Sequence, residues 1–529
     1  MSIATELQDL NDNILDAYSA VQTKGGTVPA HKNMENLDDA ITSIPSGGGS
    51  PYDIPRGKIV YSGRNTLAVP FLGQSETFTI PNDIEVIGPF ALAYAFYGFV
   101  TGNLHGGVYA VDLNNVEEVM TSGMLGFAGR TSNTGATSSI TANNLTTAGT
   151  EAFHSAFSYF GGSTISFPKL STAGQQSFQN AFSNARNNNG ITASFPELTT
   201  AGYEAFKQCF NTSFSIKGIV SASFPKLTTA GSYCFQQVFS GVTALDSVNF
   251  EKLNSAGSYC FNEAFPNTSS STITTVNFPE LTEAGDRAFN TAFRTPSITT
   301  VTFPELATLG VNCFQSAFTG CNIGSISFPK VENVPNYGFS NAFYKTSNHG
   351  VLQSASFPKV TSVGSGGFSY AFSGQATITS VGGAGCDVSI PLIATGTQGS
   401  FDYMFQNCTS LSTATFPALA SITGTTRGLS YVFKGCTSLT TVTFPMLSSI
   451  PQSTACYYMF QNCTSLSSVS FPALTTSSFG SYNNQFSNML RGCTGVTVHF
   501  PAAIQSTIGN WSDVTNGFGG TNTTVLFDL

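Results

Sequence analysis

The sequence predicts an α/β solenoid, an array of about sixteen repeats that each contribute one strand and one short helix. A phrase of the kind seen at Thr440–Leu447, TTVTFPML, returns at intervals of 25 to 33 residues. Between copies, two apolar residues, usually phenylalanines, lie four positions apart. Only 9% of the residues are charged, but 46 phenylalanines supply ample side chain to bury. Because self-similarity at a fixed period indicates stacked repeats, we expect one long array.

Each copy of the phrase predicts a short strand with one buried face. Val442 and Phe444 alternate with hydroxyl residues, which is the period of a strand. Pro445 lacks an N–H group, so it can end a strand but cannot continue one. We place the strand ends at Ile80, Leu113, Ala142, Phe167, Phe195, Phe224, Phe250, Phe278, Phe303, Phe328, Phe357, Ile390, Phe416, Phe444, Phe471 and Phe500.

The segment after each strand predicts a turn and a short helix. In Leu227–Ser240, Ala230-Gly231 predicts the turn, and Phe235 and Phe239 share one helix face, so both rings should pack against the strands. The same pair occurs at 153/157, 178/182, 206/210, 261/265, 289/293, 314/318, 339/343, 368/372 and 401/405, and in altered form as Leu429/Phe433, Cys456/Phe460 and Phe486/Leu490. Each buried ring contributes roughly 1.5–3 kcal/mol, so we interpret these phenylalanines as core. This period is typical of leucine-rich-repeat-like solenoids.

Residues 1–45 predict a small helical hairpin. The first helix has apolar residues at a 4-3-4-3-4 spacing, which forms one seam. The second begins near Pro29 and ends at Pro45. The seam either packs against the neighbouring helix or joins copies of the chain, which would make residues 1–45 an attachment or oligomerisation module and the protein a homo-oligomer. The seam residues are Ile3, Leu7, Leu10, Ile14 and Val21, with Ala17 between the last two.

The remaining boundaries follow from composition. Residues 46–52 are a Gly/Ser linker, and residues 53–76 form an N-terminal cap or transition. The solenoid extends over residues 77–505. Residues 506–529, which include Trp511 and a final strand within Thr523–Leu529, should form a C-terminal cap, because an open solenoid end exposes its core.

Composition argues against several classes of protein. A net charge of −9 with only 20 basic residues does not fit nucleic-acid binding. No apolar run of about 18 residues is present, so we expect no membrane insertion. The first residues lack the basic start and apolar core of a signal peptide, so we expect synthesis and retention in the cytosol.

The cysteines and histidines predict no cofactor or metal site. Cys408, Cys436, Cys463 and Cys493 recur once per repeat, which suits small buried residues in an internal column. An odd total of 11 cysteines and a reducing compartment disfavour disulfides. There is no CxxC motif, and the five histidines are not paired at ligand spacing.

No arrangement of residues predicts catalysis. We find no Ser/His/Asp set, no phosphate-binding glycine loop and no flanking pair of carboxylates, so we do not expect an enzyme. A carbohydrate-active enzyme on a solenoid is kept as a third alternative. Charged residues after the FP pair form one external column that is solvated or weakly paired: Glu197, Glu280, Glu305, Lys169, Lys226, Lys330 and Lys359.

The outward strand positions are mostly hydroxyl residues. They either simply suit strands and solvent, or they form a shallow site for a polyhydroxylated glycan or a partner protein. The binding interpretation is weaker because these strand positions include no aromatic ring on which a sugar could stack. The candidate binding residues are Thr275, Asn277, Thr300, Thr302, Ser325, Ser327, Ser354 and Ser356. Longer connections are further candidates for specificity: Asn184–Gly190, Asn211–Gly218, Asn267–Thr272, Lys345–Val351 and Gln375–Asp387.

The late repeats resemble a known family. Met404–Leu419 reads MFQNCTSLSTATFPAL, and Val432–Leu447 and Met459–Leu474 repeat it closely. This phrase resembles the BspA-type leucine-rich repeat of bacterial surface proteins, and the resemblance extends over roughly residues 77–505. The chain departs from that pattern in its second helical phenylalanine and in lacking the cysteine in most early repeats.

The N-terminal module is similar to the start of tailed-phage virion proteins. The similarity rests on the amphipathic helix, the Gly turn, an ENLDDAITSIP helix and the Gly/Ser linker. It implies a non-enzymatic virion structural protein of the tail, baseplate or fibre, which attaches to other virion proteins through this module and displays the repeats for adhesion to a host cell-surface glycan or protein. The alternative is a BspA-like adhesin on the bacterial cell surface, exported by an unconventional route.

Overall fold

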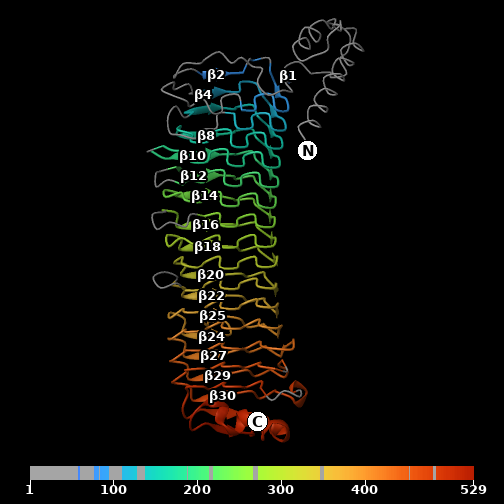
Figure 1. Cartoon of the computed structure of the whole chain (residues 1–529), viewed down its shortest axis with the longest axis vertical. Coiled ribbons are helices and arrows are strands. Elements are labelled where there is room, and N and C mark those ends of the chain that lie inside the picture. The colour runs from blue at the N-terminus through green and yellow to red at the C-terminus, as the bar shows by residue number, and fades with distance from the viewer. Residues whose placement is uncertain are drawn as a thin grey trace, which may run out of the picture. The chain divides into compact units, whose positions relative to one another are not determined.

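The computed structural model describes residues 58–59, 77–80, 82, 84–94, 110–127, 137–187, 189–213, 218–265, 272–345, 351–451, 453–479 and 484–529. The chain divides into two compact units, residues 1–58 and 59–529. The predicted helical hairpin, its seam residues (Ile3, Leu7, Leu10, Ile14 and Val21) and the linker lie outside the described residues. The second unit is a β-solenoid whose coils stack along one axis (Figure 1).

The first face of the solenoid is made of short parallel strands. Each of the sixteen strand ends expected from the sequence directly follows a strand, so these strand positions are confirmed. The strands are β2 (Thr77–Thr79), β4 (Ala110–Asp112), β6 (Ser139–Thr141), β8 (Thr164–Ser166), β10 (Ile191–Ser194), β12 (Ile219–Ser223), β14 (Ser247–Asn249), β16 (Thr275–Asn277), β18 (Thr300–Thr302), β20 (Ser325–Ser327), β22 (Ser354–Ser356), β24 (Ser380–Gly382), β25 (Val388–Ser389), β27 (Thr413–Thr415), β29 (Thr441–Thr443), β30 (Ser468–Ser470), β31 (Thr497–His499) and β32 (Thr524–Leu526). They form sheets in the orders β2-β4-β6, β14-β12-β10-β8, β16-β18 and β20-β22-β25-β24-β27-β29-β30-β31-β32.

A second face consists of two-residue strands. They are β1 (Lys58–Ile59), β3 (Val86–Ile87), β5 (Glu118–Val119), β7 (Thr147–Ala148), β9 (Thr172–Ala173), β11 (Thr200–Ala201), β13 (Thr229–Ala230), β15 (Ser255–Ala256), β17 (Glu283–Ala284), β19 (Thr308–Leu309), β21 (Asn333–Val334), β23 (Ser362–Val363), β26 (Thr395–Gly396) and β28 (Ser421–Ile422). Only β1 was expected, since the alternation at Lys58–Tyr61 indicates a capping strand. At the predicted Ala-Gly turn, Ala230 ends β13 and is buried. A Cβ on Gly231 would lie 2.7 Å from the Gly202 carbonyl carbon, so glycine is required by the close approach of neighbouring coils.

The third face is a series of turns, and the short helix predicted for each repeat is wrong. Tyr233 and Gln237 have φ values of 58° and 52°, which no α-helix contains. Alternate N–H groups bond three residues back within the coil, and those between them bond to the next coil: Phe235 N–H donates to Cys260 O at 2.8 Å. A left-handed residue every fourth position also returns the chain to the same face. Phe235 and Phe239 are therefore both buried, as expected, without a helix.

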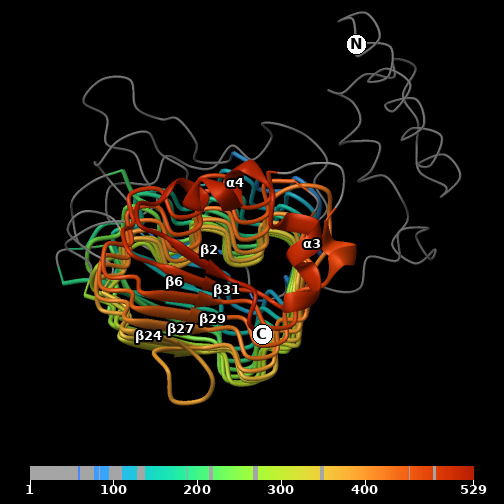
Figure 2. The same cartoon turned by 90° about the horizontal axis from the view of Figure 1, so that it is seen from below.

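Helices occur in the described residues only as short segments near the C-terminus. They are the 3-10 helices η1 (Thr476–Ser478), η2 (Ala502–Ile504) and η3 (Gly517–Gly519), and the α-helices α3 (Gln505–Ile508) and α4 (Ser512–Thr515). The view along the solenoid axis shows α3 and α4 at the C-terminal end of the stacked coils (Figure 2). Trp511 and Phe518 are buried there. None of the helices that the structure describes has the length and apolar character needed to cross a bilayer.

Stacked phenylalanine rings fill the interior. Phe278 stacks on Phe303 with ring centroids 5.3 Å apart and planes 1° apart. Phe289 stacks in the same way on Phe314, at 5.2 Å and 4°. These two columns meet edge to face, since Phe278 and Phe289 are 5.1 Å apart at 71°. Offset stacking and edge-to-face contact are the preferred geometries of aromatic pairs, so three rings per coil form a continuous core.

The cysteine column is buried, as predicted, and all eleven cysteines are free thiols. Burial raises the pKa of Cys408 to about 12 and that of Cys493 to about 11. Each thiol of the column donates to a carbonyl of the preceding coil: Cys408 to Phe372 at 3.1 Å, Cys436 to Phe405 at 3.1 Å, Cys463 to Phe433 at 3.0 Å and Cys493 to Phe460 at 3.0 Å. These cysteines thus act as small core residues that also satisfy a buried carbonyl.

Candidate interaction surface

The candidate binding residues lie on the outer side of β16, β18, β20 and β22, which we call the hydroxyl face. In each of these strands the middle residue is buried, and the two flanking residues point to solvent. The six candidates on the first three strands are exposed, and the two on β22 are half-buried. The eight residues are Thr275, Asn277, Thr300, Thr302, Ser325, Ser327, Ser354 and Ser356.

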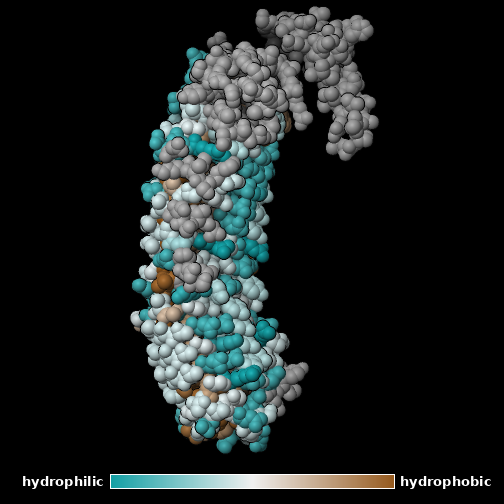
Figure 3. All heavy atoms as spheres, turned by 60° about the vertical axis from the view of Figure 1, so that its left-hand side comes forward, coloured by the Kyte–Doolittle hydropathy of each residue, from teal (hydrophilic) through white to brown (hydrophobic). Residues whose placement is uncertain are grey.

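These side chains lie in two rows along the solenoid, set by parallel pairing of β16 with β18 and of β20 with β22. Thr275 pairs with Thr300, and Asn277 pairs with Thr302, whose hydroxyl donates to the Asn277 amide oxygen at 2.7 Å. Neighbouring strands of a sheet are about 4.7–4.9 Å apart, so the rows repeat their donors and acceptors at that interval. Figure 3 shows a molecular face with mainly hydrophilic and neutral residues and few hydrophobic ones. The hydroxyl face is therefore a shallow, polar and regularly spaced surface.

The charged column after the FP pair contains ion pairs between adjacent coils. Lys226 Nζ lies 2.7 Å from a Glu197 carboxylate oxygen, and the two side chains are 55% and 47% exposed. Lys252 pairs with Glu280, and Lys330 pairs with Glu305, at similar exposure. Exposed pairs contribute about 0–1 kcal/mol each, so this column contributes little to stability.

A row of stacked tyrosines on the turn face was missed by the sequence analysis. Tyr370, Tyr403, Tyr431 and Tyr458, which we call the tyrosine row, occupy equivalent positions in consecutive repeats and are half-buried. Their ring centroids are separated by 4.3, 4.4 and 5.3 Å, with planes 2–7° apart. All four have a positive φ, which turns the side chain outward between two buried neighbours. A tyrosine two residues after the first buried core position in four successive repeats was the signal that could have revealed the row.

Basic side chains accompany the tyrosine row. Lys434 Nζ lies 5.4 Å from the ring centre of Tyr431. Arg491 approaches the Tyr458 ring to 5.6 Å, and its Nη1 donates to the Tyr458 hydroxyl at 2.8 Å. Burial, and then the neighbouring tyrosines, raises the pKa of Tyr403, so its hydroxyl stays protonated. The row therefore presents phenols and cations together.

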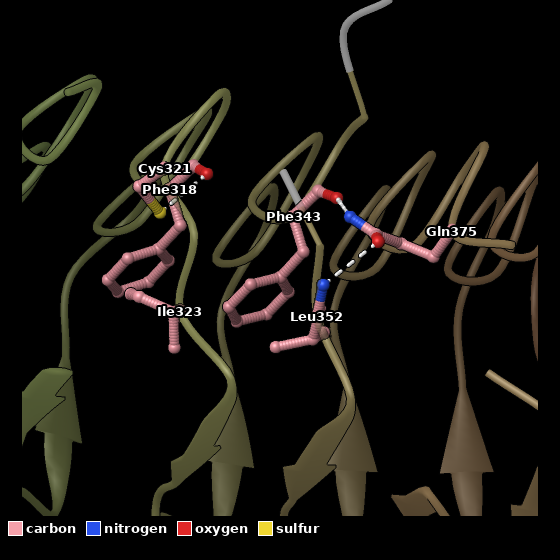
Figure 4. A pocket seen from close by; sticks show the side chains of 6 residues that line it. All are labelled: Phe318, Cys321, Ile323, Phe343, Leu352 and Gln375. Atoms are coloured by element: carbon pink, nitrogen blue, oxygen red, sulfur yellow. Dashed lines mark hydrogen bonds between the residues drawn. The ribbon is translucent and has the colours of Figure 1, made fainter. Parts of the chain in front are cut away.

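A small cavity lies between two coils next to the phenylalanine columns (Figure 4). It is lined by Phe318, Cys321, Ile323, Phe343, Leu352 and Gln375. The Gln375 amide donates to the Phe343 carbonyl at 2.6 Å and accepts from the Leu352 N–H at 3.1 Å. The volume of the cavity, about 10 Å³, is at the lower limit for one water molecule. Ligand pockets hold about 300–1,000 Å³, so this cavity is a packing gap rather than a binding site.

The longer connections differ from one another. Gln375–Asp387 lies wholly within the described residues, whereas the other four candidate connections include residues outside them. Gln375–Asp387 contains β24, which inserts between β25 and β27 and adds a strand to the sheet. The Asp387 carboxylate accepts from the Thr379 N–H at 2.6 Å and from the Thr379 hydroxyl at 2.8 Å. This connection is therefore a bonded part of the first face.

No cluster of three or more His, Cys, Asp and Glu side chains suited to a metal ion occurs in the described parts of the chain. His499 contacts the Asp528 carboxylate at 3.0 Å, and neither belongs to such a cluster. The surfaces described above offer hydroxyl, phenol and basic groups. These groups can form hydrogen bonds and ion pairs with a polar or charged partner.

Comparisons with known proteins identify a family and several similar structures. The model of the BspA type leucine rich repeat region matches residues 154–317, 211–345, 262–381 and 401–506, which together exceed half of the chain. No curated protein matches the chain. A leucine-rich repeat protein of Bacteroides ovatus is 16% identical, with 88% of this chain and 94% of that chain covered and a TM-score of 0.44. The pneumococcal vaccine antigen PcpA is 14% identical, with 86% and 89% covered and a TM-score of 0.34.

A leucine rich cell surface protein of Faecalibacterium prausnitzii is 15% identical, with 75% of this chain and 88% of that chain covered and a TM-score of 0.28. The family match includes the three late phrases that carry the resemblance in the sequence, since all of them lie within residues 401–506. It also reaches into the earlier repeats, where the cysteine column is incomplete. The chain belongs to the BspA type leucine-rich repeat family.

Proposed function

We propose that this chain is a non-enzymatic adhesion or interaction protein that binds a host cell-surface glycan or protein through the outer surface of its solenoid. The observation that carries the proposal is the hydroxyl face, where paired rows of exposed Ser, Thr and Asn side chains follow consecutive strands. The family supports the same role, because BspA-type repeats are typical of bacterial surface proteins. The phenylalanines of the stacked columns are buried, which leaves the polar surface for binding.

The proposed mechanism is non-covalent recognition, without catalysis. Each hydroxyl both donates and accepts, so a sugar or a peptide backbone can form several hydrogen bonds with a shallow surface. A rigid array keeps these groups in fixed positions, which lowers the entropy lost on binding. If residues 1–45 join copies of the chain, several weak sites act together, and avidity can exceed single-site affinity by about two to four orders of magnitude.

Two settings are compatible with this role. In the first, the chain is a virion component of the tail, baseplate or fibre, attached to other virion proteins through residues 1–45; the similarity of those residues to virion proteins supports this setting. In the second, it is a BspA-like adhesin of the bacterial cell surface; the family of the repeats supports this setting. Both place the solenoid towards a host surface.

Binding of the recombinant full chain to host cells tests the proposed function. Replacing Thr300 and Ser325 by lysine puts two bulky charges into one of the two rows and should reduce binding at least tenfold. Thr441→Lys, at an exposed position of the same face far along the solenoid, is the control and should leave binding unchanged. Equal binding by wild type and the double variant would contradict the use of the hydroxyl face.

Mass spectrometry of purified particles and of the cell-surface fraction distinguishes the two settings. A stoichiometric amount in particles supports the virion component, and an amount confined to the cell surface supports the adhesin. Deletion of residues 1–45 should abolish incorporation into particles while the solenoid stays folded. Normal incorporation of the deleted chain would contradict the attachment role of the module.

A further inference from the structure

Three of the four tyrosines of the row lie in a stretch of the solenoid that carries a net positive charge. From Val388 to Val498 the chain has three basic residues, Arg427, Lys434 and Arg491, and one acidic residue, Asp402. Asp402 is only 6% exposed, and its carboxylate accepts the N–H groups of Gly428 and Ser430 at 3.3 and 3.1 Å. The rest of the chain is acidic overall, since the whole carries a net charge of −9. Residues 388–498 therefore contain no exposed carboxylate to pair with these three cations.

The geometry of the row indicates an extended partner. The phenols follow one another at the interval of successive coils, with ring centroids 4.3–5.3 Å apart. The rings cover one another's faces, so they offer their edges and hydroxyl groups rather than a flat platform. Lys434 and Arg491 stand at two of the four tyrosines, which places charge at intervals and a hydroxyl at every step. A linear molecule lying along the solenoid axis would meet all of these groups in turn.

We propose that the tyrosine row, with Lys434 and Arg491 beside it, binds an acidic polysaccharide, one whose sugar units carry hydroxyls throughout and carboxylates at intervals. The inference rests on the proposed function and specifies a partner class and a second surface for it. Arginine binds carboxylate with two parallel hydrogen bonds, and phenols exchange hydrogen bonds with sugar hydroxyls. A phosphodiester polymer fits less well, because it carries a charge at every unit and few hydroxyls for the phenols to bind.

A second tyrosine cluster in the central coils provides a matched comparison. Tyr233 stacks on Tyr259 with ring centroids 4.7 Å apart and planes 6° apart, and Arg287 lies over the Tyr259 ring at 5.3 Å. This cluster has carboxylates nearby, since Glu263 accepts a hydrogen bond from Gln237 on the same face, and Asp286 directly precedes Arg287. Lys207 lies over the Tyr233 ring at 5.7 Å, but it is paired with Glu204 at 2.7 Å. Stacked tyrosines with two cations are therefore present there without the excess of positive charge.

Residues at equivalent positions of other coils indicate which substitutions of the tyrosine row the fold tolerates. At the positions equivalent to Tyr403 and Tyr431, other coils have Asn180 and Asn341, with φ values of 53° and 55°. Asparagine adopts this left-handed conformation readily, so Tyr→Asn removes the phenol without straining the turn. The phenol variant is Tyr403→Asn/Tyr431→Asn, the cation variant is Lys434→Gln/Arg491→Gln, and the control variant is Tyr233→Asn/Tyr259→Asn.

Binding of the full chain to polygalacturonate, to neutral dextran and to a single-stranded DNA oligonucleotide tests the proposal. We expect binding to polygalacturonate that weakens with added salt, and no binding to dextran. The phenol variant and the cation variant should each lose at least tenfold in affinity, and the control variant should be unchanged. Thermal unfolding of each variant, compared with wild type, confirms that the solenoid is intact.

Four results would overturn the proposal: no binding to polygalacturonate, equal binding to dextran, tighter binding to the oligonucleotide, or unchanged affinity in both the phenol and cation variants. Binding of the same variants to host cells separates this inference from the proposed function. If the variants bind host cells like wild type while Thr300→Lys/Ser325→Lys does not, the hydroxyl face is the binding surface and the tyrosine row is not.

Discussion

Replacing Phe289 by alanine should strongly destabilise the central coils. The side chain is fully buried in the described core. Its ring lies within 5.1–5.8 Å of five others, those of Phe261, Phe278, Phe293, Phe303 and Phe314. Phe→Ala in a packed core costs about 3–5 kcal/mol. The stacked rings above and below are held by their own coils and cannot collapse into the cavity, so we expect the upper part of that range.

Phe289→Leu is the matched control, because Leu429 occupies the equivalent position of a later coil and is fully buried there. It keeps most of the volume and should cost about 1.5 kcal/mol or less. Guanidinium unfolding followed by circular dichroism gives the change in free energy, and hydrogen exchange locates it. Since each coil contacts only its neighbours, protection should fall over residues 261–314 and be kept over residues 416–471.

The reasoning would be refuted if Phe289→Ala lost less than about 1 kcal/mol, or if it lost no more than Phe289→Leu. Either result would mean that the columns do not carry the stability of the solenoid. A loss of protection spread equally over all coils would contradict the nearest-neighbour character of the array.

Three further predictions test other features. Ser316 has a φ of 54°, so Ser316→Gly should be more stable than Ser316→Ala by about 1 kcal/mol, whereas a helix at this position would give the opposite order in thermal unfolding. Burial raises the pKa of Asp402 to about 6, above its unfolded value, so its ionisation in the folded state costs stability as pH rises through about 6. Asp402→Asn should therefore raise the melting temperature at pH 7.5 and change it little at pH 4; a larger gain at pH 4 would contradict this assignment. Of the eleven cysteines, only Cys386 is partly exposed, so a thiol reagent should label about one thiol per native chain, and labelling of several would contradict the buried column.

The strand positions could be predicted because their determinants are local. A proline without an N–H group and a period of two fix where each strand ends and which face it buries, as at Val442, Phe444 and Pro445. The burial of the paired phenylalanines and of the cysteine column followed from their recurrence, because a residue repeated in every coil of a stack must meet its own copies. The family could also be recognised from the late phrases alone.

The helix prediction was wrong because two different backbone structures share one period. Phe235 and Phe239, four residues apart, point to the same side in a helix and also in a turn series with a left-handed residue at every fourth position. The two structures differ in where the backbone N–H groups bond, and half of those partners lie in the next coil, 25 to 33 residues away. The two-residue strands other than β1 were missed for the same reason, since β13 is a strand only through its pairing with β11 and β15.

The surface also has some features that could be predicted from the sequence and others that depend on the tertiary structure. The sequence by itself determined that the outward strand positions are hydroxyl residues, because alternation assigns every second side chain to solvent. Only the tertiary structure decided that Tyr370, Tyr403, Tyr431 and Tyr458 stack into one row with Lys434 and Arg491 beside it. These residues are far apart in the chain, and they meet because the coils stack in register, which depends on hydrogen bonds between coils and not on any one repeat.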